Sequence, residues 1–140
     1  MGTNYYLHQR GNLLERLERD EPLVRHIGKS SGGWCFALRV YPDEGINSLT
    51  DWYHLLRRDN NIIKDEYDCE VTLEELIEVI TNRSWRPRVF QPTDRCPTEQ
   101  AMLDLNHAVY GPNNLLRSKI GEHCSGHGPG TWDLIPGNFS

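Results

Sequence analysis

The chain lacks a hydrophobic run long enough to cross a membrane, and its cysteines form no closely spaced pair. A spanning helix needs roughly 18 to 20 apolar residues in a row, and the first residues do not show the charged-then-apolar order of a secretory signal. The 4 cysteines are scattered without a C-x-x-C motif, which is typical of free thiols in a reducing compartment. We therefore expect a cytoplasmic protein with no membrane partner.

An excess of positive charge is also missing. The sequence has 15 Lys and Arg residues against 20 Asp and Glu residues, which gives a net charge of −5. Proteins bind duplex nucleic acid chiefly by neutralising its phosphates with Lys and Arg. The charge balance therefore argues against general duplex binding, although local basic patches remain open.

What is present suits one domain spanning 1–140, because 140 residues with 37% apolar content can bury a single core. Alternating apolar residues predict strands at 3–8, 34–40, 62–67 (as an edge strand) and from Trp132 onward. Capping residues before apolar stripes predict helices at 12–20, after Ser48, after Thr72, and after Thr98 with the stripe Met102, Leu105 and Val109. The predicted fold class is α+β, a small antiparallel or mixed sheet covered by two to four helices.

The most informative segment is a polar, glycine-rich stretch directly before the predicted strand at 34–40. Its candidate ligand-binding residues are His26, Gly28, Lys29, Ser30, Ser31, Gly32, Gly33 and Trp34. Read as a loop, this stretch can present backbone N–H groups and small donors to an anion, because glycine permits close approach. The alternative is a plain turn in which the serines hydrogen-bond their own backbone.

This stretch is not a nucleotide-binding P-loop. Gly28, Lys29 and Ser30 match the end of G-x-x-x-x-G-K-[ST], but the first glycine position is Leu23. A P-loop also follows a strand and opens a helix, whereas this segment precedes a strand. We therefore exclude an NTPase of that type and keep a looser phosphate site.

A second glycine-rich segment, 126–131, precedes the short strand near the end of the chain. Pairing of the two following strands would bring both glycine segments together, which adds His127, Thr131 and Trp132 to the candidate ligand-binding residues. In this hypothesis Lys29 pairs with phosphate and a tryptophan, Trp34 or Trp132, stacks on a base.

The densest set of metal-ligand residue types is formed by His123, Cys124 and His127. Zinc takes four protein ligands in structural sites and three in catalytic ones. One compact cluster supplies at most three, so that His8, His26 or Cys96 would have to join by folding. A bound zinc ion is therefore a candidate that the pattern does not favour over loop histidines near a thiol.

Catalytic residues cannot be assigned from the spacing. The ingredients of a metal-dependent phosphohydrolase are present as His26, His127, Asp133 and the pair Asp65 and Glu66, with Lys29 and Ser30 to hold the anion. Nothing in the spacing makes them converge, so the sequence favours a non-enzymatic protein.

An arginine-rich stretch at 83–95, with Trp85 and Phe90, offers a different function. Its guanidinium and aromatic groups can anchor in a protein pocket or stack on bases. The alternative is a solvated loop whose Trp85 packs onto the core.

Three blocks resemble a family of small, uncharacterised proteins of tailed bacteriophages and prophages. They are residues 1–6 (MGTNYY), residues 26–34 (HIGKSSGGW) and residues 130–137 (GTWDLIPG), and the resemblance spans the chain. It also implies a C-x-x-C between the positions of His8 and His26 in some relatives, completing a zinc ribbon. Here that interval has no cysteine, which argues against zinc at His8 and His26.

The resemblance implies an accessory protein in the cytoplasm of an infected bacterial host, acting in counter-defence or host takeover. Combined with the glycine-rich segments, it predicts a binding protein for an anionic nucleotide-type ligand. The alternatives are an inhibitor that binds a host defence protein or nuclease complex, and a metal-dependent phosphohydrolase. Homodimerisation could complete a site between subunits.

Overall fold

A computed structural model describes residues 2–9, 24–58, 61–83, 90–111, 115–119, 123–124 and 132–137, with only the backbone at 123–124. The predicted helix at 12–20 and the glycine segment 126–131 lie outside the described residues, as do residues 84–89 of the arginine-rich stretch 83–95.

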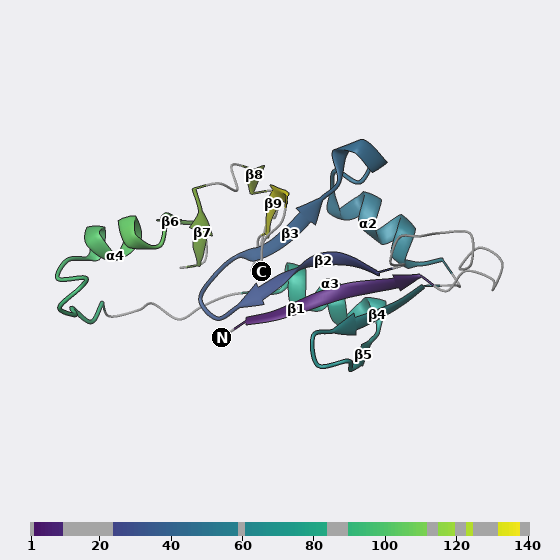
Figure 1. Cartoon of the computed structure of the whole chain (residues 1–140), viewed down its shortest axis with the longest axis horizontal. Helices are drawn as coiled ribbons and strands as arrows, with labels where there is room; N and C mark the ends of the chain where they lie inside the picture. Colours follow the sequence, from purple (N-terminus) through teal and green to yellow (C-terminus); the bar gives the residue numbers. More distant parts are fainter. Residues whose placement is uncertain are drawn as a thin grey trace.

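The centre of the fold is a mixed sheet with the strand order β5-β4-β1-β2-β3-β9-β8 (Figure 1). Its strands are β1 (Gly2–Gln9), β2 (Val24–Ser31), β3 (Phe36–Val40), β4 (Asn61–Asp65), β5 (Glu70–Val71), β8 (His123–Cys124) and β9 (Trp132–Pro136). Neighbouring strands are antiparallel except for β3 and β9, which pair in parallel. Together with the helices, this mixed sheet confirms the predicted α+β fold class.

Two capped helices cover one face of this sheet, α2 (Leu49–Leu56) and α3 (Leu73–Thr81). Ser48 accepts a hydrogen bond from the Asp51 N–H, and Thr72 accepts one from the Glu75 N–H. Such caps satisfy N–H groups that have no partner within the helix. Both predicted helix starts are thus confirmed.

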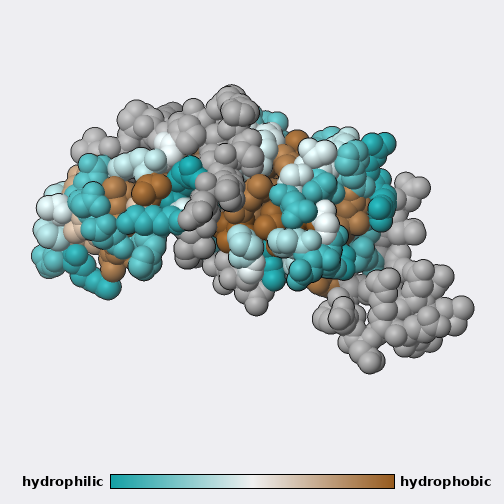
Figure 2. All heavy atoms as spheres, turned by 90° about the horizontal axis from the view of Figure 1, so that it is seen from above, coloured by the Kyte–Doolittle hydropathy of each residue, from teal (hydrophilic) through white to brown (hydrophobic). Residues whose placement is uncertain are grey.

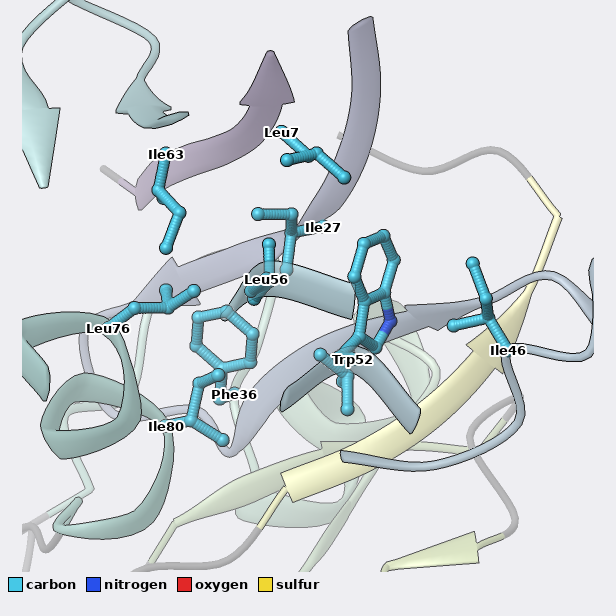
Figure 3. Packing of buried hydrophobic residues seen from close by; sticks show 10 residues of the cluster. Leu7, Ile27, Phe36, Ile46, Trp52, Leu56, Ile63, Leu76 and Ile80 are labelled. Atoms are coloured by element: carbon cyan, nitrogen blue, oxygen red, sulfur yellow. The ribbon is translucent and has the colours of Figure 1, made fainter. Parts of the chain in front are cut away.

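The hydrophobic core lies between these helices and the sheet. The Phe36 ring packs among side chains from the sheet and both helices, and the fully buried Trp52 lies close to Ile46 (Figure 3). The Trp52 indole also donates a 2.7 Å hydrogen bond to the Arg39 carbonyl. This bond satisfies a polar group that would otherwise be costly to bury.

The glycine-rich stretch forms strand β2, not a loop, which corrects the sequence-based expectation. Tyr5 pairs with Gly28 and Tyr6 with His26, so Ile27 is one extra residue in β2. This β-bulge shifts the alternation of side chains, so that Ile27 enters the core while His26 and Lys29 share the opposite face. Only residues 32–35 remain as the connection to β3.

Two other expectations need correction. Strand β4 is interior, because β5 pairs with its outer side. The helix after Thr98 ends early: α4 (Glu99–Leu105) stops before Val109, which lies in strand β6 (Ala108–Tyr110). The positive φ of His107 lets the chain reverse there.

Strand β6 pairs with β7 (Leu116–Ser118), and with α4 this hairpin forms a lobe at one end of the molecule (Figure 1). Hydrophobic residues show at the surface of this lobe, at the left of Figure 2, in keeping with the exposure of Leu105, Val109 and Tyr110. No helix in the described ranges combines the length and apolar character needed to span a bilayer.

Candidate functional site

The sheet face opposite α2 and α3 carries two buried groups with large pKa shifts, His26 and Asp133. Side chains alternate between the two faces of a strand, so residues next to core positions lie on this second face. We call it the polar face and define it by Asn4, Tyr6, His26, Lys29, Arg39 and Asp133.

The register places three of these residues, together with Ala37, in one row across the sheet. Asn4 pairs with Lys29, Lys29 with Ala37, and Ala37 with Asp133. Neighbouring strands are about 4.8 Å apart, so Lys29 and Asp133 flank the small Ala37 side chain from either side. The backbone positions of Lys29 and Asp133 are thus roughly 10 Å apart, with the Ala37 methyl group between them in the row.

His26 is the first buried titratable group of this face. Its Nε2 lies 2.8 Å from Oδ1 of Asn4, and its ring packs against Tyr6. The pKa of His26 is lowered to about 4, chiefly by burial and also by the charges of Arg39 and Lys29, while a hydrogen bond with the Gly28 backbone opposes the shift. The imidazole is therefore neutral at pH 7.

Asp133 is the second buried titratable group, with only 2% of its surface exposed. Burial raises its pKa to about 6, against the opposing effects of Arg117 and the Ser118 backbone. The Arg117 Nε lies 3.1 Å from Asp133 Oδ1. Groups whose pKa values are displaced in this way gather at functional sites, and structural ion pairs produce the same displacement.

Lys29 differs from the other cations of this face. It makes no hydrogen bond or ion pair with any described residue. Its aliphatic stem runs over Gly2, where a Cβ would lie only 2.5 Å from Lys29 Cε. Among the described residues, no carboxylate neutralises the ammonium group of Lys29.

The connection between β2 and β3 is held by Arg83, which sequence reasoning noted only as part of an arginine-rich stretch. Its guanidinium donates to the Trp34 carbonyl at 3.0 Å, to Ser30 Oγ at 2.5 Å and to the Ser31 carbonyl at 2.5 Å. These acceptors are oxygens, so this segment binds a cationic group of the chain itself. No spacing in the sequence links Arg83 to residues some 50 positions earlier.

The remaining predicted site residues lie in different parts of the structure and do not form one site. Gly33 lies in the turn with φ +82°, and its carbonyl accepts from the Leu116 N–H. Trp132 packs against the core cluster on the helix-covered face, away from Lys29. Gly32 is exposed in the same turn as Gly33, whereas His127 and Thr131 lie outside the described residues.

The starts of β3 and β9 do lie side by side, as expected for strands that follow the two glycine segments, because Phe36 pairs with Trp132. For the metal candidates, the backbone of His123 pairs with Leu134 and that of Cys124 with Asp133. Within the part of the chain that the structure describes, no three His, Cys, Asp or Glu residues are grouped to hold a metal ion.

The two buried groups predict opposite pH dependences of stability. The lowered pKa of His26 stabilises the fold above its unfolded value of 6.5, and this contribution is lost as the pH falls toward 4. The raised pKa of Asp133 stabilises the fold below its unfolded value of 3.8, and this contribution is lost as the pH rises toward 6. Each effect is on the order of 3 kcal/mol, so the two largely cancel between pH 4 and 6.

Substitution of either His26 or Asp133 should reveal the pH dependence of stability that the other residue contributes. In Asp133→Asn, the free energy of unfolding should fall more steeply than in the wild type as the pH is lowered from 6.5 to 4.5. In His26→Gln, it should fall less steeply or rise. Urea denaturation at several pH values measures both slopes, and equal slopes in the two variants would contradict these assignments.

Comparison of the chain with protein-family models, with curated proteins and with solved structures found no match.

Proposed function

We propose that this protein is a non-enzymatic binding protein that holds an anionic, nucleotide-type ligand against the polar face. The observation that carries the proposal is Lys29, an ammonium group without a partner among the described residues, next to Arg39 and the neutral His26. Phosphate groups are recognised by such cations together with uncharged hydrogen-bonding groups.

The charge distribution around Lys29 supports this ligand class. The Asp133 carboxyl group is buried and paired with Arg117. The Glu66 carboxylate, which lies beside Asn4, accepts a 2.9 Å hydrogen bond from the Asn4 N–H. Both carboxyl groups thus have partners within the protein, whereas the Lys29 ammonium group has none among the described residues.

The biological setting that we propose is an accessory role in a bacteriophage-infected bacterium. A small protein that sequesters a nucleotide would deprive a host defence system of its signal. This part of the proposal rests on the resemblance of the three sequence blocks.

Lys29→Met tests the ligand class. It removes the cation but keeps much of the stem that covers Gly2, so stability should change little. A charge-assisted contact to phosphate contributes about 1.5 to 3 kcal/mol, so affinity for the best ligand in a panel of mono-, di- and cyclic nucleotides should fall roughly 10- to 100-fold. Isothermal titration calorimetry measures this loss.

The matched control is Lys119→Met, which removes the same charge from an exposed position after β7. It should bind the nucleotide within twofold of the wild type. The proposal fails if no nucleotide of the panel binds, or if both lysine variants bind as the wild type does. Ser30 is left unchanged because its Oγ accepts from Arg83.

A further inference from the structure

A groove of about 450 Å³ lies at the opposite side of the molecule from the polar face, between α2, β4, β5 and the start of α3. Apolar side chains contribute to its lining from all four elements: Leu56, Ile63, Val71 and Leu73. Leu56 and Ile63 belong to the buried core, and Val71 and Leu73 pack against it. The volume is within the range of sites that hold small molecules.

Charges of both signs line the same groove. Arg57 and Arg58 follow α2, whereas Glu70 lies on β5 and Glu74 in the first turn of α3. None of these four side chains forms an ion pair with another described residue. The opposite charges thus share a groove without neutralising one another.

Aromatic surface is present at the arginine end. Tyr53 is 41% exposed and lines the groove, with the Arg57 guanidinium 5.8 Å from the centre of its ring. This contact leaves the guanidinium edges of Arg57 able to donate hydrogen bonds. A ligand that enters here meets apolar surface together with cations and carboxylates.

We propose that this groove binds an aliphatic zwitterion of dipeptide size. Its carboxylate would pair with Arg57 and Arg58, its ammonium with Glu70 and Glu74, and its aliphatic side chains would contact Val71 and Leu73. Arginine matches a carboxylate with two parallel hydrogen bonds. A ligand with a single charge would pair with either the arginines or the glutamates of the groove, whereas a zwitterion pairs with both. This site uses different residues from the anion site and is independent of it.

Three chemically matched probes test the proposal. Dileucine carries both charges, N-acetyl-dileucine lacks the ammonium, and dileucine amide lacks the carboxylate. We expect dileucine to produce saturable shifts of the backbone amide signals of Val71, Leu73 and Glu74 in ¹H–¹⁵N NMR spectra of the full chain. Each single-charge probe should bind about three- to tenfold more weakly.

Two substitutions at exposed positions identify which charged group of the ligand each side of the groove contacts. Arg58→Met should weaken binding of dileucine and N-acetyl-dileucine, but not of dileucine amide. Glu74→Gln should weaken binding of dileucine and its amide, but not of the acetylated form. Arg95→Met removes an exposed arginine that does not line the groove, and should leave all three affinities unchanged.

The proposal is overturned if dileucine causes no saturable shifts at the groove, or if the three probes bind equally well. It is also overturned if Arg58→Met weakens binding of dileucine amide as much as binding of the acetylated probe. The effect of the arginine would then not depend on a carboxylate in the ligand. The comparison among probes needs no variant, so it holds even if a substitution perturbs the fold.

Discussion

Arg83→Met should lower the free energy of unfolding by about 3 to 5 kcal/mol, because it removes three hydrogen bonds from a charged, half-buried donor, each of which contributes on the order of 1.5 kcal/mol. The substitution keeps an unbranched side chain of similar length but removes all three hydrogen bonds to the β2–β3 connection. The carbonyls of Ser31 and Trp34 would lose these donors while the stem still shields them from water. Chemical denaturation followed by tryptophan fluorescence measures the loss.

Arg83→Lys separates charge from geometry. Lysine restores the positive charge, but its single ammonium cannot reproduce the planar fork that reaches three acceptors. We expect Arg83→Lys to recover only a minor part of the lost stability. Arg95→Met, at an exposed position, should change stability by less than about 0.5 kcal/mol. A wild-type stability in Arg83→Met would show that the guanidinium does not hold the connection.

Gly28→Ala should destabilise the protein by more than about 4 kcal/mol or prevent folding, which is the expected scale for overpacking against backbone and a fixed ring. A Cβ on Gly28 would lie 2.5 Å from Cε1 of Phe36 and in severe contact with the Ala37 carbonyl oxygen. The Phe36 ring is fully buried and the carbonyl belongs to a paired strand, so neither can move aside easily.

The control is Gly45→Ala, because Gly45 has φ +76° and nothing within 4 Å of the added Cβ. It should cost only about 1 kcal/mol, the backbone penalty at a positive φ. Circular dichroism and thermal unfolding distinguish the two variants. Equal losses would mean that Gly28 matters only as a flexible residue, whereas a larger loss at Gly28 identifies a close packing contact.

Local chemistry allowed several elements to be predicted. The caps Ser48, Thr72 and Thr98 each accept the expected backbone hydrogen bond, because capping depends only on residues within one turn. The alternation from Phe36 to Val40 marked β3 correctly, since its apolar residues enter the core. The predictions were wrong where local preference competed with pairing to distant residues. Val109 was assigned to a helix but lies in the β6–β7 hairpin, and β4 was assigned to the sheet edge but is interior.

The candidate site could be predicted only in part. His26 and Lys29 stood out in the sequence as polar groups near glycines, and both lie on the polar face. Their partners Asn4, Arg39 and Asp133 come from three other strands and are brought close by register alone. The bulge at Ile27 hid the strand character of this segment, because an extra residue breaks the two-residue alternation on which strand prediction relies.

By itself the sequence determined the fold class and the positions of the described helix caps. These properties depend on composition and on contacts between residues close along the chain. Only the tertiary structure decided that β2 is a strand, that Arg83 holds its connection to β3, and that His26 and Asp133 are buried on one face. Such features arise from pairings across tens of residues, where burial and neighbouring charges set each group's chemistry and local sequence carries no record of the partner.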